Sequence, residues 1–305
     1  MRLVVLALLA PWLLVLAACM QPVSVLQPAG LHPLDATLWD VARAEPITPD
    51  TLTERLRTAD FAILGETHDN PVHHARQAWL LARLGVAGIA FEMVPEASEE
   101  GIQVFLDQGG TRAEIGPAIG WARLGWPDWS MYAPVFAASE SAYIAGAGVA
   151  RLRLTQAMAA GAARAFGTGA RAYGLDRPLD TGLRRALQTE MAAAFCDTLT
   201  PEMTAGMVEA QRLRGARMAH ALRRAAAAGG GRAVLVAGNV HARRGSGVPG
   251  YLRASAPETA VLSLGQIEVV EGAESLAAYT EAGLDYDYVW FSNAPTREDP
   301  CVELR

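Results

Sequence analysis

Short, mostly apolar stretches recur along the chain and end at glycine or polar residues. They cover residues 61–64, 88–91, 142–145, 232–236, 261–264 and 288–291. Runs of this length without alternation are typical of strands that are buried on both faces of a parallel sheet. An amphipathic stretch over residues 72–84 separates the first two runs, and this arrangement predicts a β-α-β unit.

No strand pattern appears between about residues 152 and 228, which are rich in Ala, Arg, Leu and Met at helical spacing. We therefore expect a helical insertion of about 152–228, ended by the glycines at 229–231. Strands that alternate with helices predict an α/β fold, a mostly parallel sheet flanked by helices. We expect one such domain over residues 34–305.

The N-terminal segment has the pattern of an export signal. Residues 3–18 are almost continuously apolar, follow Arg2 and end in the lipobox-like sequence Leu16–Cys19. This stretch is short for a membrane span, so we predict a signal peptide over 1–18 and a lipidated Cys19. An uncleaved anchor and a signal without lipidation are the alternatives. Residues 19–33 contain several prolines and no periodic pattern, which favours a tether.

The residue after Cys19 is Met20 rather than Asp, so nothing marks retention in the inner membrane. We expect an outer-membrane lipoprotein that faces the periplasm. The two remaining cysteines, Cys196 and Cys301, form an even pair in a compartment where disulfides persist, and we predict that they are bridged. Two unpaired thiols, or two metal ligands, are the alternatives.

Composition removes several classes of protein. The 305 residues carry a formal net charge of −6, and 51% of them are hydrophobic, which excludes a disordered chain. An acidic chain without a block of basic residues is not typical of a nucleic-acid binder. Every basic residue other than histidine is arginine, so lysine Schiff-base chemistry is excluded.

Candidate chemistry follows the predicted strands. Two Gly-x-x-His motifs, Gly65 to His68 and Gly238 to His241, and two strand-end carboxylates, Glu66 and Glu92, are expected at one sheet edge. Function in open α/β sheets sits beyond the carboxyl ends of the strands. Two histidines and two carboxylates suit a divalent metal site, or a general acid and base without metal. The sequence leaves both open.

Further polar residues flank this edge. His73 and His74 lie in the first turn of the helix that starts after Pro71, where one of them is expected to point toward the strand ends. Surface imidazoles are the alternative. Three arginines follow predicted strand ends and are candidates to bind an anion: Arg151, Arg243 and Arg244.

Tryptophans are concentrated before the sequence Met131-Tyr132. Trp121, Trp126 and Trp129 at this density favour core packing. A wall for a flat, hydrophobic ligand is the alternative.

Taken together, the motifs resemble those of the ChaN-type haem-binding uptake lipoproteins. This family lies in a wider group that also holds Tiki/TraB-type proteases and erythromycin-esterase-like enzymes. The resemblance covers nearly the whole mature chain in order. It rests on residues 64–70 with His73, His74 and Gln77; residues 91–93; Trp129 with Tyr132 and Pro134; Arg151; Gln211 with Arg214, Met218 and Ala219; residues 237–241 with 247–249; and residues 286–290 with 299–301.

The resemblance implies an α/β core with a helical subdomain, and haem bound as a cofacial pair between two subunits. The family's iron ligand is a tyrosine, which suits ferric haem, and the candidates here are Tyr132 and Tyr173. The implied partners are haem, a second copy of the chain and an outer-membrane haem receptor or transporter. The implied contacts of the haem propionates are His73, His74, Arg151, Arg243 and Arg244.

The wider group implies a second function. In its Tiki-like members the same motifs resemble a metal-dependent hydrolytic site, which here consists of Glu66, His68, Glu92 and His241. Whether the chain is an enzyme is therefore left open between a haem-binding uptake lipoprotein, which we favour, and a peptidase or esterase with a divalent metal. A purely structural envelope protein would leave these strand-end residues unexplained.

Overall fold

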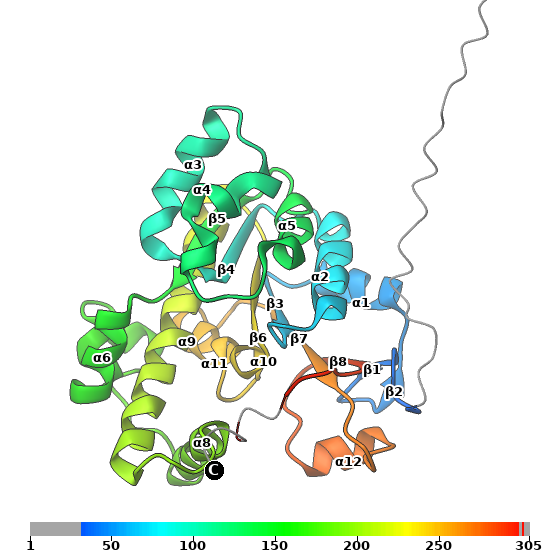
Figure 1. Ribbon diagram of the computed structural model, residues 1–305, viewed down its shortest axis with the longest axis vertical. Helices are drawn as coiled ribbons and strands as arrows, with labels where there is room; N and C mark the ends of the chain where they lie inside the picture. Colours follow the sequence, from blue (N-terminus) through cyan, green and yellow to red (C-terminus); the bar gives the residue numbers. More distant parts are fainter. Residues whose placement is uncertain (1–31, 299–300, 302–305) are drawn as a thin grey trace, which may run out of the picture.

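The computed structural model describes residues 32–298 and residue 301 (Figure 1). The predicted signal peptide 1–18, Cys19 and nearly all of the predicted tether 19–33 lie outside the described residues. Within the described part of the chain, no helix combines the length and the apolar character that a membrane crossing needs.

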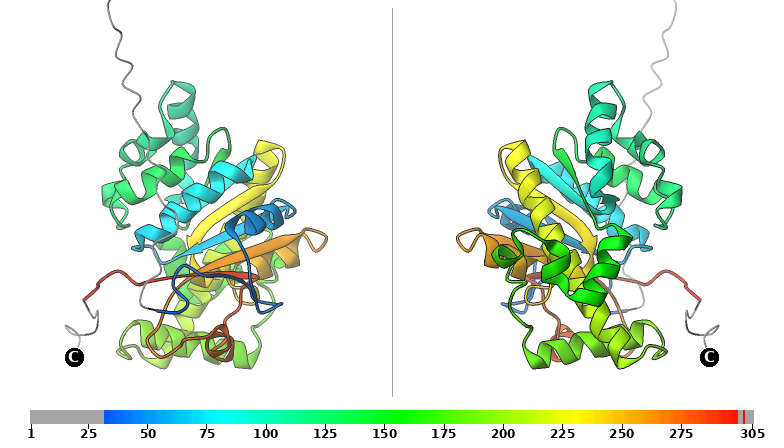
Figure 2. Two further views of the ribbon diagram at one scale, coloured as in Figure 1. Left: turned by 90° about the vertical axis from the view of Figure 1, so that its right-hand side faces the viewer. Right: turned by 90° about the vertical axis from the view of Figure 1, so that its left-hand side faces the viewer.

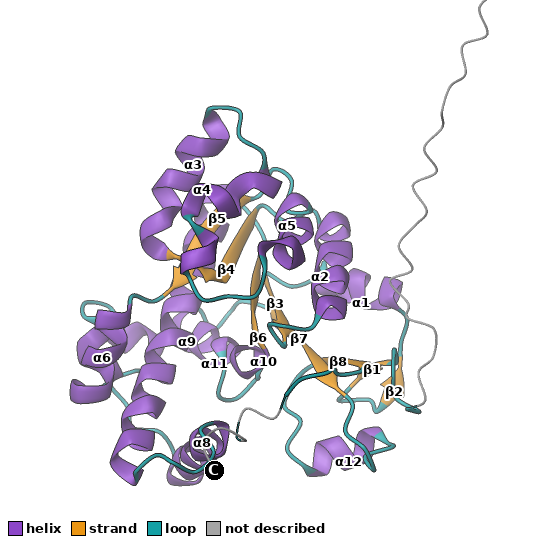
Figure 3. Cartoon of the chain, viewed as in Figure 1, coloured by secondary structure: helices purple, strands orange, loops and turns teal. Residues whose placement is uncertain are grey.

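The described residues form one eight-stranded sheet with the order β2-β1-β8-β7-β3-β6-β4-β5. Strands β3 to β8 pair in parallel, whereas β1 is antiparallel to both β2 and β8. Helices lie on both faces (Figures 2 and 3), so the predicted α/β fold class is confirmed. The strands are β1 (Leu38–Asp40), β2 (Glu45–Pro46), β3 (Phe61–Glu66), β4 (Gly88–Pro95), β5 (Tyr143–Gly148), β6 (Ala233–Gly238), β7 (Val261–Glu268) and β8 (Tyr288–Ser292).

All six apolar runs of the sequence are strands, and several extend further than predicted. β4 continues to Pro95 and β7 to Glu268. The short strands β1 and β2 were not predicted, because three and two residues carry no recognisable period.

Two apolar cores lie on opposite faces of the sheet, because successive strand residues point to opposite sides. In β3, Phe61 and Ile63 belong to one core, while Ala62 and Leu64 belong to the other. The first core is covered by α6 (Arg151–Ala160), α7 (Ala162–Phe166), η4 (Ala170–Tyr173), α9 (Pro201–Gly229), α10 (Asn239–Ala242), α11 (Val248–Ser255) and α12 (Leu276–Glu281). The second is covered by α1 (Pro49–Leu56), α2 (Pro71–Leu84), α3 (Glu99–Asp107), α4 (Ile115–Ile119), η3 (Trp121–Arg123) and α5 (Trp129–Ala137).

The short turns η1 (Glu96–Ser98) and η2 (Arg112–Glu114) complete the second side. Between β5 and β6 the described chain contains helices and turns only, from α6 through α8 (Thr181–Ala194) to α9. This is the stretch where the sequence predicts a helical insertion over about 152–228. Helix α9 is 29 residues long, and it begins at Pro201 after Thr200, whose hydroxyl accepts from the Met203 N–H.

Helix α2 carries the sequence signals that place its start beside the sheet edge. The Asn70 side chain accepts a hydrogen bond from the Val72 N–H, and Pro71 occupies the first turn, where its missing N–H is harmless. The helix ends at Gly85, whose φ of 56° suits glycine. The first turn of α2 is thereby held next to the end of β3.

A disulfide joins Cys196 to Cys301, as expected from the sequence. Cys196 lies between α8 and α9, and Cys301 follows the last strand, so the bond ties the helical segment to the C-terminal tail. Helix α8 has no buried residue. Few apolar contacts therefore attach α8 to the rest of the domain, and the disulfide adds a covalent attachment near the end of this helix.

Candidate functional site

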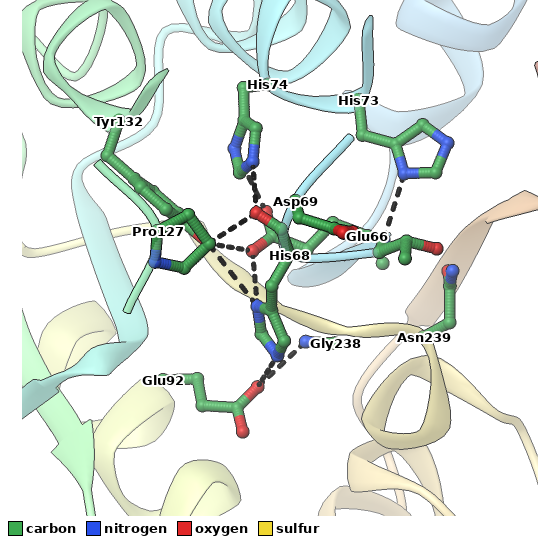
Figure 4. Close-up of polar contacts among 12 residues, drawn as sticks. Glu66, His68, Asp69, His73, His74, Glu92, Pro127, Tyr132, Gly238 and Asn239 are labelled. Atoms are coloured by element: carbon green, nitrogen blue, oxygen red, sulfur yellow. Dashed lines mark hydrogen bonds and ion pairs between the residues drawn. The ribbon is translucent and has the colours of Figure 1, made fainter. Parts of the chain in front are cut away.

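Three strands bring the predicted chemistry to one edge of the sheet. Glu66 ends β3, Glu92 lies in β4 where its register with β5 shifts, and Gly238 ends β6 just before α10, which carries His241. A bulge of this kind re-aims a side chain. Glu66, His68, Glu92 and His241 therefore come together, and we call them the Glu/His cluster. Figure 4 shows Glu66, His68 and Glu92 of this cluster.

Glu66 is the buried centre of one half of the cluster. Its Oε1 accepts from the Tyr132 hydroxyl at 2.7 Å and lies 2.7 Å from Nδ1 of His68 (Figure 4). Its Oε2 lies 3.5 Å from Nδ1 of His74. Burial disfavours the carboxylate, but the hydrogen bond from His68 and the charges of both histidines outweigh it and lower the pKa of Glu66.

His68 is the most accessible member of the cluster, with 30% of its side chain exposed. Its ring lies 4.8 Å from the ring of Trp126. Burial opposes protonation, but the hydrogen bond to Glu66 and that residue's charge raise the pKa of His68. A charged imidazolium paired with a carboxylate can donate a proton to a bound molecule.

Glu92 anchors the other half of the cluster. Its Oε2 accepts from the Gly238 N–H at 2.8 Å, and its Oε1 lies 3.4 Å from Nε2 of His241. Burial again opposes ionisation. The charge and the hydrogen bond of His241 are the largest of the interactions that outweigh it, and together these interactions lower the pKa of Glu92 to about 2. Gln211 of α9 contacts the same His241 nitrogen at 3.3 Å.

The glycines of the two Gly-x-x-His motifs are required by close approach. A Cβ atom on Gly238 would lie 2.9 Å from Nε2 of His68. A Cβ atom on Gly65 would lie 2.5 Å from Oδ1 of Asn239, whose amide also bonds the Gln266 carbonyl. These two positions therefore let the motifs pack against each other.

Within residues 32–298 and 301, no group of three or more His, Cys, Asp or Glu is arranged to hold a metal ion. The members of the Glu/His cluster contact one another instead. The choice between a divalent metal site and metal-free acid–base chemistry, which the sequence left open, stays a prediction.

His73 and His74 do point toward the strand ends, but they are 0% and 2% exposed. Nε2 of His74 lies 2.9 Å from the His68 carbonyl, and Nδ1 of His73 accepts from the Thr67 N–H at 2.9 Å. Both therefore support the loop after β3. Neither is available to contact a haem propionate directly, which corrects the implied role.

The burial of His73 predicts an acid-sensitive fold. Burial and the charge of Arg76 lower the pKa of His73 to about 2, whereas an unfolded histidine titrates near about 6.5. Below about pH 6.5 the unfolded chain therefore binds a proton that the folded chain does not. The free energy of unfolding falls as the pH drops through this range, by up to about 1.4 kcal/mol per pH unit. We expect His73→Gln to lose this component. Urea unfolding of the parent and the variant at several pH values between acid and neutral measures how the free energy of unfolding depends on pH. An equal pH dependence in both proteins would contradict the prediction.

A cleft of about 660 Å³ opens beside the cluster, and we call it the large cleft. Pockets of some 300–1,000 Å³ are typical of small-molecule and cofactor sites. Its lining residues are Glu92, Met93, Pro95, Glu96, Ala97, Leu124, Trp126, Gly148, Val149, Ala150, Arg153, Arg214, Arg217 and Met218. Trp121 is buried in the core, and Trp126 and Trp129 pack against it, as core packing requires. Trp126 also lines the cleft, and its role as a wall for a flat ligand stays a prediction.

A small pocket of about 230 Å³ lies between α8, α9 and α11. Tyr173 and Tyr251 line it, together with apolar residues of α8 such as Leu187. It is smaller than typical cofactor sites. The large cleft is therefore the better candidate for a ligand of haem size.

Neither candidate iron ligand lines the large cleft. Tyr132 is 0% exposed, and burial with the charge of Glu66 raises the pKa of its hydroxyl. Tyr173 is 5% exposed, and its hydroxyl lies 3.0 Å from Nδ1 of His220. Coordination of iron by either tyrosine stays a prediction.

Two of the three predicted anion-binding arginines are already paired with carboxylates. Arg243 makes two hydrogen bonds to Glu190, at 2.6 and 2.9 Å, and Arg244 lies 3.1 Å from Asp287. Arg151 is exposed at the start of α6.

The cleft instead receives cations that the sequence analysis did not choose as anion-binding candidates, although Arg214 is among the residues that carry the resemblance. Arg153 comes from α6, and Arg214 and Arg217 come from α9. The available signal was spacing, since Gln211, Arg214 and Met218 follow an i, i+3, i+7 pattern that places them on one helix face.

Comparison with known proteins places these features in context. Residues 52–252 match the family model described as "Haem-binding uptake, Tiki superfamily, ChaN". No curated protein sequence matches the chain.

Two solved structures are similar over most of the chain. The structure described as cofacial heme binding to ChaN of Campylobacter jejuni is 19% identical, with a TM-score of 0.62, over 83% of this chain and 95% of that one. The type III effector HopBA1 is 12% identical, with a TM-score of 0.46, over 81% of this chain and 94% of that one. The first of these likenesses shows a common fold.

Proposed function

The chain belongs to the ChaN family of haem-binding uptake proteins in the Tiki superfamily, and we propose that it binds haem in the large cleft. The family resemblance predicted from the motifs is thereby confirmed. The observation that carries the proposal is the match over residues 52–252 together with a cleft of about 660 Å³ beside Trp126.

The residues that line the large cleft suit both parts of a haem. Leu124, Trp126 and Met218 contribute apolar surface, and arginines from α6 and α9 contribute positive charge. A porphyrin ring packs against apolar and aromatic surface, and its propionates pair with cations. Bound there, haem would carry the iron that the uptake function requires.

The cell-envelope location is part of the same proposal. The lipobox before Cys19 supports a lipoprotein of the outer membrane that faces the periplasm, with the tether joining it to the folded domain. The Cys196–Cys301 disulfide is compatible with an oxidising compartment. We further propose a homodimer that exchanges haem with an outer-membrane receptor or transporter.

The test is a haemin titration of the chain from Gln21 onward, followed by absorbance and by size-exclusion chromatography. We expect saturable binding at one haem per chain and a shift from monomer to dimer. A matched His68→Ala, His241→Ala variant is expected to keep most of the haem affinity if a tyrosine holds the iron, because neither histidine lines the large cleft itself. A chain that gives no saturable spectrum would contradict the haem-binding proposal, and saturable binding without a dimer would contradict only its dimeric part.

The Glu/His cluster favours a second candidate function, hydrolysis of a peptide or ester. His68 is paired with Glu66 and, when protonated, can act as a general acid, and Glu92 with His241 can orient or activate water. Hydrolysis of a panel of esters and peptides that disappears in the same double variant would support this function. Activity unchanged by both substitutions would exclude the cluster as its source.

A further inference from the structure

We propose that Glu190 and Arg297 are positioning residues for the Glu/His cluster, and that the Cys196–Cys301 disulfide joins them into one clamp. The clamp holds the two segments of chain that carry the histidines of the cluster. The inference goes beyond haem binding, because it concerns how the cluster is held rather than which ligand occupies the large cleft.

The first histidine segment, residues 67–70, is fastened by Arg297 of the C-terminal tail. Arg297 donates to both carboxylate oxygens of Asp69 at 2.6 Å, and Asp69 directly follows His68. The same guanidinium donates to both oxygens of Glu268, at the end of β7, at 2.6 and 2.7 Å. One side chain therefore ties this segment to the sheet through two bidentate contacts, the geometry in which such pairs are strongest.

The second histidine segment, residues 239–247, is fastened by Glu190 of α8. Both oxygens of Glu190 accept from Arg243, at 2.6 and 2.9 Å, and Arg243 comes shortly after His241. His241 in turn lies 3.4 Å from Glu92. Glu190 therefore fixes one end of α10, the helical turn that presents His241 to the cluster.

The two fastening side chains lie on weakly packed parts of the protein. Helix α8, which carries Glu190, has no buried residue. Residues 294–298, which include Arg297, are exposed or half-buried. The disulfide joins these parts, because Cys196 follows α8 and Cys301 follows Arg297. It therefore connects the two anchors to each other, and through them the two histidine segments.

The backbone beside the disulfide supports a fixed connection. Cys196 and Asp197 both have a φ of 56°, a left-handed conformation that is uncommon for residues other than glycine. Such a conformation persists where the surrounding structure holds it. The link between α8 and α9 is therefore not freely adjustable, and a displacement of the tail is expected to be transmitted to α8.

The clamp makes the geometry of the cluster depend on oxidation. A dithiol reductant transfers two electrons and two protons, so that the protein disulfide becomes two thiols and the reductant becomes a disulfide. Both cysteines are half-buried beside exposed residues, so a small reductant can reach them. Reduction leaves both ion pairs chemically intact but lets their anchors move. In a chain exported as its N-terminal signal predicts, the cluster reaches its final geometry only after the bond forms in an oxidising compartment.

Amide hydrogen exchange in the protein used for the haemin titration measures the effect, because each segment contains hydrogen-bonded amides. The Thr67 amide donates to His73, and the Asn70 amide donates to the Thr67 carbonyl, so both report on the first segment. The Gly247 amide donates to the Arg243 carbonyl and reports on the second segment.

We expect reduction of the parent by dithiothreitol to accelerate exchange at least about 10-fold in both histidine segments. Arg297→Gln is expected to accelerate exchange in the first segment only, and Glu190→Gln in the second only. Reduction of Arg297→Gln then changes the second segment but adds nothing in the first, and reduction of Glu190→Gln gives the reverse. A general loss of stability does not produce this pattern.

Two controls and one rescue separate positioning from stability. Glu54→Gln removes one carboxylate of the exposed pair with Arg57 and is expected to change neither segment. The Glu114 amide, which donates to the Thr111 carbonyl, is the reference and is expected to exchange at one rate in all proteins. Arg297→Lys keeps the charge and is expected to restore part of the protection in the first segment.

The His68 ring gives an independent signature at fixed pH. Its Nδ1 lies 2.7 Å from Glu66, so in protein with ¹⁵N-labelled histidine its N–H signal is expected in the oxidised parent and is expected to broaden on reduction. Segments that exchange alike before and after reduction would overturn the clamp. Single variants that loosen both segments and the reference turn equally would overturn it too. Because the single variants keep the disulfide, they decide the question even if the reduced chain unfolds.

Discussion

Replacing Cys196 and Cys301 together by serine is expected to lower the free energy of unfolding by about 2–4 kcal/mol. The bond joins residues 105 positions apart, and a crosslink over a loop of that length strongly restricts the unfolded chain. The loss is expected first in α8, because this helix has no buried residue and is attached at one end by the bond. Urea unfolding measures the first effect, and hydrogen exchange in α8 measures the second.

The matched control for the disulfide is chemical reduction. The parent chain in excess reductant is expected to unfold at the same urea concentration as the double serine variant. The unfolding midpoint of the variant is expected to be the same with and without reductant. Identical midpoints for oxidised parent and variant would show that the bond carries no stability.

Replacing Glu66 by alanine is expected to cost about 3–5 kcal/mol of folding free energy, because it breaks a buried charged network from its centre. Glu66 is the hydrogen-bond partner of both the Tyr132 hydroxyl and the His68 ring. Without Glu66, burial still disfavours the protonated form of His68, and the carboxylate that stabilised this form is gone. The pKa of His68 therefore falls from its raised value. Chemical denaturation and an NMR titration of the histidine follow the two effects.

Two further variants sharpen this test. Glu66→Gln keeps an acceptor for Tyr132 and removes only the charge, so it is expected to lose less stability than alanine while it still lowers the pKa of His68. Glu54 forms an exposed pair with Arg57, and Glu54→Ala is expected to change stability by less than about 1 kcal/mol. Equal effects at positions 54 and 66 would contradict the central role of Glu66.

The fold was largely predictable because its strands are buried on both faces. A run such as residues 61–64 carries its own apolar signal, and Asn70, Pro71 and Gly85 mark the two ends of α2 locally. The short strands β1 and β2 were not predicted because pairing across the sheet, rather than any local pattern, makes them strands.

The candidate site was predictable in membership but not in accessibility. The rule that parallel strands end at one edge was enough to group Glu66, Glu92 and His241. It did not indicate that His73 and His74 are buried, or that Arg243 is paired with Glu190. Those outcomes depend on which distant elements cover each side chain.

The sequence by itself determined the α/β class, the strand-end grouping of glutamates and histidines and the family, because these depend on periodicity and on motif order. Only the tertiary structure decided which groups are charged, which are exposed and where a ligand fits. Burial and distance arise from packing between segments far apart in the chain. The approach of α6 and α9, which places Arg153 beside Arg214 and Arg217 on one cleft, is such a case.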